Sequence, residues 1–245
     1  MIRILRKIRQ KLMEQGATRN YVFYAIGEIG LVVLGILIAL QINNWNEERK
    51  DLAEERSLIQ NLHVEFQANI SSLHDVSILL EQSTHAMSTL LNIMDKSSPT
   101  SYTTNQLDSL IYQCIANPPW TRSEYTLRDL EGSGRLRQLT DDSLKVALYE
   151  WTRLNEEIVL RENQATTSYN DLLRFLKRHA ALRQLDRFGL LEEGPSIIKK
   201  DNVHLLSNLE FENAVDDFLI YTRQRLIRYQ RAERMLEEIM TLSSD

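Results

Sequence analysis

The longest apolar segment of the chain covers residues 21–42, with the sequence YVFYAIGEIGLVVLGILIALQI. Its one charged residue is Glu28, and the run from Ile29 to Leu40 contains no polar side chain. At 1.5 Å per residue, a helix of this segment is about 33 Å long, enough to cross a bilayer core of about 30 Å. The pattern therefore predicts a transmembrane helix.

The alternative for residues 21–42 is a buried core helix of a water-soluble protein, and the flanking residues argue against it. Aromatic residues stand where lipid headgroups are expected, with Tyr21 and Tyr24 at one end and Trp45 at the other, and Arg19 lies just outside. Glycine, which weakens soluble helices, is common in membrane helices. Both observations favour the membrane.

Charge predicts the orientation of this helix. Residues 1–20 have a net charge of +5, from Glu14 and six bases: Arg3, Arg6, Lys7, Arg9, Lys11 and Arg19. The positive-inside rule places this end in the cytoplasm and the C-terminal part outside. A cleaved signal peptide is the alternative, but the apolar segment is longer than an h-region and residues 41–45 (QINNW) lack the small residues of a cleavage site. We expect an uncleaved signal anchor.

The basic N-terminal segment also has an apolar pattern of its own. Ile4, Leu5, Ile8 and Leu12 recur at helical spacing with bases between them. This is typical of an amphipathic helix on an anionic inner leaflet, so membrane lipid is an expected partner. The alternative is a disordered basic tail that serves only orientation.

Helical periodicity continues beyond the membrane segment. No glycine or proline occurs in residues 36–98, and apolar residues from Leu52 to Met94 follow a three-four spacing typical of a coiled coil or packed helix, so the membrane helix is expected to continue as a stalk. Shorter helices are predicted at 105–116 and 123–131, separated by Asn117-Pro118-Pro119. Long helices are predicted from about Asp141 to Ala180 and, after a capping box at Ser207–Glu210, to Leu242.

No convincing strand alternation interrupts these patterns, so the predicted fold class is all-α. One N-terminal transmembrane helix continues into a stalk and is followed by an antiparallel helical bundle. The predicted organisation is a basic cytoplasmic segment at 1–20, a transmembrane helix at 21–42 and an extracytoplasmic bundle at 43–245.

Composition narrows the partners and the chemistry. The whole chain has a net charge of −5, so the residues after the basic segment carry −10, which argues against nucleic acid as a partner. The one cysteine, Cys114, excludes an intrachain disulfide and a thiolate zinc cluster. Because Cys114 lies on the apolar face of a short helical pattern, we expect it to be buried.

Three residues of the membrane segment share one helix face. Gly35 and Ala39 lie 7 and 11 residues after Glu28, close to whole numbers of turns. Small residues four apart allow close packing of membrane helices, and an acid inside a membrane is a functional candidate by default. This face is the predicted transmembrane interface with a second copy or another membrane protein. The alternative is that Glu28 reaches the cytoplasmic headgroups.

A second candidate is the histidine series His63, His74 and His85, at intervals of 11 residues. On one helix these side chains form a stripe whose members are about 16.5 Å apart, too far to bind one metal. In a parallel oligomer the stripe could form layers that charge near pH 6. Coincidence at the edge of a core stripe is the simpler interpretation.

Enzyme signatures are absent from the sequence. Gly132-Ser133-Gly134-Arg135 lacks the third glycine and the preceding strand of a dinucleotide loop, so it is interpreted as a turn. The carboxylates Glu156, Glu157 and Glu162 lack the Glu-x-x-His partner of a di-iron bundle. No GxSxG, HExxH or CxxC motif occurs. We expect no catalytic residue, cofactor or metal.

The membrane segment also carries a specific motif. The stretches YAIGEI at 24–29, LVV at 31–33 and GILIALQINNWNE at 35–47 resemble the N-terminal signature of an uncharacterised family of bacterial single-pass membrane proteins, known as a domain of unknown function. The resemblance extends to about Lys50. It implies a bacterial inner-membrane protein and brings no activity, cofactor or catalytic residue. Together with the orientation predicted from charge, it leads us to expect the C-terminal domain in the periplasm.

Three function classes remain open. The first is a membrane-anchored interaction or scaffold protein that assembles through its transmembrane helix. The second is an accessory subunit of a proton-driven complex, since its layout is similar to that of ExbD-like proteins. The third is a sensory bundle that binds a small ligand outside and signals through a partner.

Overall fold

The structure is a computed structural model that describes residues 18–95, 102–189, 198 and 200–244. The chain divides into two compact units, residues 1–57 and residues 58–245. All regular structure in the described residues is helical, without strands. The all-α prediction is confirmed.

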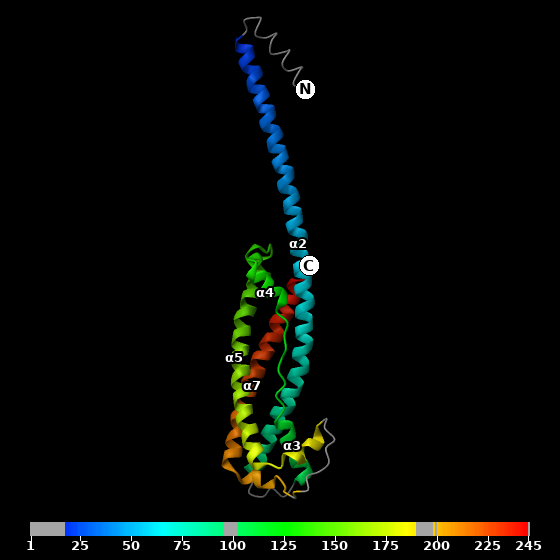
Figure 1. Cartoon of the computed structure of the whole chain (residues 1–245), viewed down its shortest axis with the longest axis vertical. Helices are drawn as coiled ribbons and strands as arrows, with labels where there is room; N and C mark the ends of the chain where they lie inside the picture. Colours follow the sequence, from blue (N-terminus) through cyan, green and yellow to red (C-terminus); the bar gives the residue numbers. More distant parts are fainter. Residues whose placement is uncertain (1–17, 96–101, 190–197, 199, 245) are drawn as a thin grey trace. The chain divides into compact units, whose positions relative to one another are not determined.

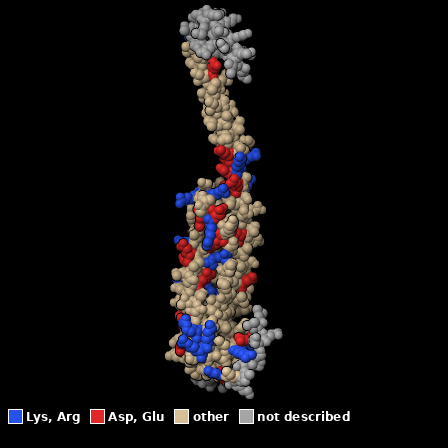
Figure 2. Space-filling view, in the orientation of Figure 1, with Lys and Arg blue, Asp and Glu red and all other residues tan. Residues whose placement is uncertain are grey.

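The N-terminal unit consists of the first part of helix α2, which runs without a break from Thr18 to Met94. Within α2 lies a segment long and apolar enough to cross a membrane, and none of its most apolar window is buried. Figure 2 shows a mostly uncharged surface along this part of α2, with one acidic patch near its upper end. The predicted continuation of the apolar helix into a stalk is confirmed, whereas the predicted stop at residues 97–99 lies outside the described residues.

The second unit is a helical bundle around three long helices (Figure 1). These are the part of α2 from Leu58 onward, α5 and α7, joined by short helices and 3₁₀ turns. The bounds are α3 Thr104–Cys114, α4 Tyr125–Gly132, η1 Arg135–Gln138, α5 Asp142–His179, α6 Leu182–Leu185, η2 Asp186–Phe188, η3 Val203–Ser207 and α7 Leu209–Leu242. The helices predicted from residue 21 onward are present, with ends shifted by a few residues, whereas the amphipathic helix predicted at Ile4 to Leu12 lies outside the described residues.

Helix starts follow capping chemistry. The Asp141 carboxylate accepts hydrogen bonds from the backbone N–H groups of Ser143 and Leu144 and so begins α5. The predicted capping box at Ser207 is wrong, because the N-cap of α7 is Asn208, whose side chain accepts from Phe211 N. A reciprocal box lies instead at Thr103, before α3, where the reciprocal partner is Gln106.

Ring contacts and hydrogen bonds give the directions of the long helices. Phe66 of α2 packs on Trp151 of α5, and farther along both helices Met87 and Leu172 share one hydrophobic cluster. Helices α2 and α5 therefore run in the same direction. Helix α7 runs opposite to both, as its last turn shows, where Ser243 contacts His63. The bundle thus combines antiparallel pairs with one parallel pair.

An extended segment, residues 115–124, makes the parallel pair possible. It follows α3 and runs back along α2 to α4, as the thin green trace in Figure 1 shows. Pro118 and Pro119 favour this extended backbone and prevent a helix. The predicted break at these prolines is correct. Because the extended segment carries the chain back along α2, α5 starts beside the first turns of the bundle part of α2.

The core of the bundle consists of two hydrophobic clusters. Cluster A includes Leu62, Phe66, Trp120, Trp151 and Tyr229. Cluster B includes Met87, Cys114, Leu172, Phe175, Phe211 and Phe218. Cys114 is 1% exposed, which confirms its predicted burial, and this burial raises the pKa of its thiol.

Candidate functional site

The predicted transmembrane interface lies on an exposed part of α2. Glu28, Gly35 and Ala39 are all exposed, and a Cβ atom added at Gly35 would meet no atom within 4 Å. Glu28 makes no hydrogen bond or ion pair with any residue that the structure describes. The face is therefore open to lipid or to a second helix.

The residues predicted to anchor the helix are described only in part. Arg19 is exposed, and Trp45 is 59% exposed with the Arg49 guanidinium 5.8 Å from its ring centroid. The indole is thus available to a headgroup layer. The other predicted anchoring bases, Arg3, Arg6, Lys7, Arg9 and Lys11, lie outside the described residues.

The histidine series has no shared environment. His63 is half-buried, with Nδ1 3.0 Å from Ser243 Oγ, whereas His74 and His85 are exposed. Among the described residues no group of three or more histidine, cysteine, aspartate or glutamate side chains is placed to hold a metal. His63 is a structural residue at the end of the bundle.

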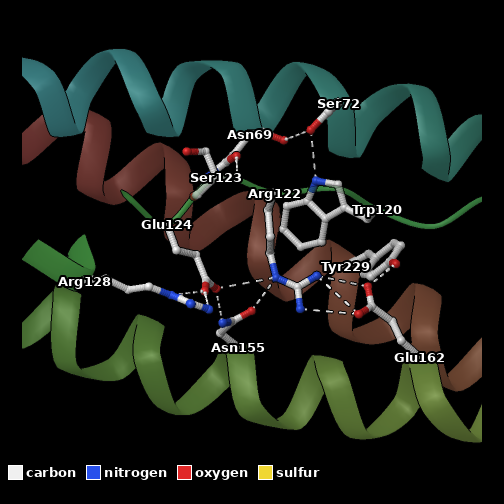
Figure 3. Close-up of polar contacts among 10 residues, drawn as sticks. All are labelled: Asn69, Ser72, Trp120, Arg122, Ser123, Glu124, Arg128, Asn155, Glu162 and Tyr229. Carbon is white, nitrogen blue, oxygen red and sulfur yellow. Dashed lines mark hydrogen bonds and ion pairs between the residues drawn. The ribbon is translucent and has the colours of Figure 1, made fainter. Parts of the chain in front are cut away.

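A polar network that the sequence analysis did not predict connects the extended segment with α2, α5 and α7 (Figure 3). Trp120 of this segment packs edge-on against Trp151 and Tyr229, with centroids 6.3 and 5.3 Å away. Its indole N–H donates to Ser72 Oγ at 3.0 Å. The aromatic ring is thus held inside cluster A while its polar atom is paired, as a buried tryptophan requires.

Arg122 is the centre of the network. Its guanidinium donates to both carboxylate oxygens of Glu162, at 3.0 and 3.3 Å, and from Nε to Asn155 Oδ1. It also lies 4.8 Å from the Trp120 ring centroid. The side chain is only 9% exposed, and a charge so buried is stable only when paired in this way.

Two further residues complete the network. Tyr229 of α7 donates from its hydroxyl to Glu162 at 2.6 Å. The pKa of Tyr229 is raised, and burial is the largest cause of this shift. On the other side, Asn155 donates to Glu124, which also accepts from the exposed Arg128. Glu162 is therefore a shared acceptor for the extended segment and α7.

Helix α2 fixes the backbone of the same segment. The Asn69 amide accepts from Ser123 N and donates to Ser123 O, both at 2.7 Å. One turn before, Glu65 accepts at 2.7 Å from the N–H of Thr126, in the first turn of α4, where a helix leaves the N–H without a partner of its own. The Asn69 contacts supply the hydrogen bonds that the non-helical backbone at Ser123 does not make within a helix.

The network joins the extended segment to three helices through paired polar groups. Arg122 pairs with Glu162 and Arg128 with Glu124, and the described histidine that contacts a hydroxyl is His63, with Ser243. The sequence contains a signal for one member of this network, Trp120. A tryptophan directly after two prolines is a large apolar group on a non-helical segment, and such a group requires a core to receive it.

Comparison with known proteins adds one match. The model of a family of unknown function, DUF6090, matches residues 28–174, more than half of the chain. This range starts at Glu28, within the N-terminal motif, and extends through α2, α3, α4 and most of α5, well beyond Lys50, where the recognised resemblance ended. No curated protein and no solved structure gives a significant match. The chain belongs to DUF6090, a family of unknown function.

Proposed function

We propose that this protein is a non-catalytic, membrane-anchored helical interaction or scaffold protein of a bacterial inner membrane. In this proposal residues 21–42 cross the membrane, the N-terminus is cytoplasmic and the helical bundle lies in the periplasm. Its partners are membrane lipid and either a second copy or another membrane protein, and nucleic acid is not among them.

One observation supports assembly through the membrane helix. Glu28, Gly35 and Ala39 share a face that is exposed along its length, and Glu28 has no partner among the described residues. An acid in a membrane helix is costly unless it finds a polar partner, and small residues four apart allow a second backbone to approach. A second helix on this face would satisfy both conditions.

The experiment is crosslinking of the full chain in native membranes. We expect Gly35→Leu to lower the crosslinked fraction, because the larger side chain holds the two backbones apart. A contact worth about 1.4 kcal/mol corresponds to a tenfold change in association. The matched control is Gly30→Leu, the same substitution on the opposite face of the helix, where a Cβ atom also meets nothing within 4 Å.

Glu28→Gln separates this function from that of a proton-driven accessory subunit. Glutamine preserves the shape and can hydrogen-bond across a helix contact, so we expect assembly to persist. A proton carrier would instead lose its growth or transport phenotype with assembly intact, since an amide releases no proton. Equal crosslinking in the Gly35→Leu and Gly30→Leu variants would contradict assembly through this face.

A further inference from the structure

A layer of polar side chains separates the two hydrophobic clusters of the bundle. Cluster A ends at Leu80 in α2 and Ile158 in α5, and cluster B begins at Ala86 and Leu172 in the same helices. Between them lie buried polar residues from every long helix, with a half-buried asparagine from the extended segment: Ser83, Ser168, Thr222, Arg225 and Asn117. A polar layer inside a core is expensive unless its groups are paired.

Arg225 is the group in this layer that is not fully paired. It is 2% exposed, and its Nη1 donates to Asn117 Oδ1 at 2.9 Å. No described protein group accepts from its Nε or Nη2. These two N–H groups point from the same edge of the guanidinium plane, the edge that binds the two oxygens of a carboxylate or phosphate.

No carboxylate of the described residues accepts a hydrogen bond from this edge. The acid that acts on Arg225 is Glu162, and Glu162 already accepts from Arg122 and Tyr229. Burial lowers the pKa of Arg225, and Tyr229 and Glu162 oppose that shift. A guanidinium nevertheless stays protonated in proteins, so the layer holds a positive charge in a low-dielectric interior.

A second unpaired group lies one helical turn away. Thr222 is fully buried, and its hydroxyl has no partner among the described residues. Since Thr222 and Arg225 are three residues apart in α7, their side chains share a face of that helix. The Thr222 hydroxyl is thus a second donor without a partner in the same polar layer.

We propose that the polar layer is a binding site for a small oxyanion, a carboxylate or a phosphate-type ion. Nε and Nη2 of Arg225 would hold two of its oxygens, and Thr222 would donate to one of them. The extended segment forms the wall of the site on the side of Asn117. Its residues 115–118 are half-buried and not helical. In this proposal the anion enters through this part of the wall. The site is independent of the transmembrane face.

The test is an anion titration of the detergent-solubilised full chain, followed by thermal unfolding. Formate, acetate, phosphate and sulfate are compared with chloride at equal ionic strength. A ligand that binds the native state raises the unfolding midpoint as its concentration exceeds Kd, so we expect a saturable rise for at least one oxyanion. Whether carboxylates or phosphate-type ions act at the lower concentration identifies the class.

Variants distinguish anion binding at this site from the general stabilisation of folded proteins by sulfate and phosphate. Arg225→Lys keeps the charge but removes the two-donor edge, and we expect the titration midpoint to rise at least tenfold. Thr222→Val keeps the shape, loses the hydroxyl, and should raise the midpoint several-fold. Arg223→Lys, on the exposed side of the same helix, is the control and should leave the titration midpoint unchanged.

Four results would overturn the site. These are no rise with any oxyanion, an equal rise with chloride, a rise that does not saturate, or identical titrations for the wild type and Thr222→Val. If Arg225→Lys does not fold, the comparison of Thr222→Val with the wild type alone decides, since valine fills the space of threonine.

Discussion

Glu162 shows how much the role of one residue depends on its distant partners. In the sequence it is an acid on an amphipathic helix with no motif around it. In the structure it accepts from Arg122, 40 residues away, and from Tyr229, 67 residues away. These contacts connect α5 with the extended segment and with α7, so Glu162 couples three parts of the bundle.

The Tyr229 hydroxyl gives a prediction at the same scale. Tyr229→Phe removes its hydrogen bond to a charged acceptor, so we expect the free energy of unfolding at pH 7 to fall by about 1–2 kcal/mol. Tyr221→Phe, for which no hydroxyl hydrogen bond is seen in the described residues, should change it much less. Urea unfolding of both variants measures the difference.

The same variant tests a pH dependence. Burial raises the pKa of Tyr229 in the folded state, whereas the unfolded side chain loses its proton near pH 10. Above that pH the unfolded state binds fewer protons, so stability decreases with rising pH. The wild type should therefore lose stability more steeply than Tyr229→Phe between pH 9 and 11. Cys114 contributes with the same sign in both proteins, so parallel curves would contradict the prediction.

At the scale of the elements, the extended segment decides the topology. The end of α3 lies beside Ser83 of α2, whose hydroxyl donates to the Cys114 carbonyl, so a short turn at that point would start the next long helix level with Ser83. Residues 115–124 instead carry the chain back along α2, and α5 then runs parallel to it. Between Ala116 and Glu124 no helical hydrogen bond is seen in the described residues, so the position of this part depends on side chains of α2 such as Asn69.

Asn69→Ala tests this dependence. Asn69 is 2% exposed, and its amide makes two hydrogen bonds to the backbone of Ser123. Their loss removes two part-buried hydrogen bonds, each worth about 0.5–1.5 kcal/mol, from a backbone that water can still reach at Ser123. We expect the free energy of unfolding to fall by about 1–3 kcal/mol. Asn92→Ala, at an exposed site of the same helix, should have little effect, and similar losses in both variants would contradict the role of Asn69.

At the scale of the whole molecule, the orientation across the membrane can be tested with single cysteines. Tyr125 is 82% exposed, whereas the native Cys114 is 1% exposed and gives no background. We expect Tyr125→Cys to react with a membrane-impermeant maleimide in intact cells, because the positive-inside rule places the bundle outside. Arg19→Cys should react only after lysis. The reverse labelling pattern would refute both the orientation and the periplasmic location.

The sequence by itself determined which residues form helices and where the apolar segment lies. These properties are local, since periodicity, prolines, glycines and flanking charges act within a few turns. For the same reason the prolines at 118 and 119 predicted a break. Helix ends were less certain, because neighbouring polar residues compete as caps, and Asn208 rather than Ser207 begins α7.

The tertiary structure alone decided the path between helices and the partners of the buried charges. The extended return of residues 115–124 depends on contacts with residues about 50 positions earlier, such as Asn69 with Ser123. Arg122 and Arg225 look like surface residues in the sequence, since a charge carries no local mark of the partner it will meet. Only packing shows that Arg122 is fully paired inside the core and that one edge of Arg225 is not.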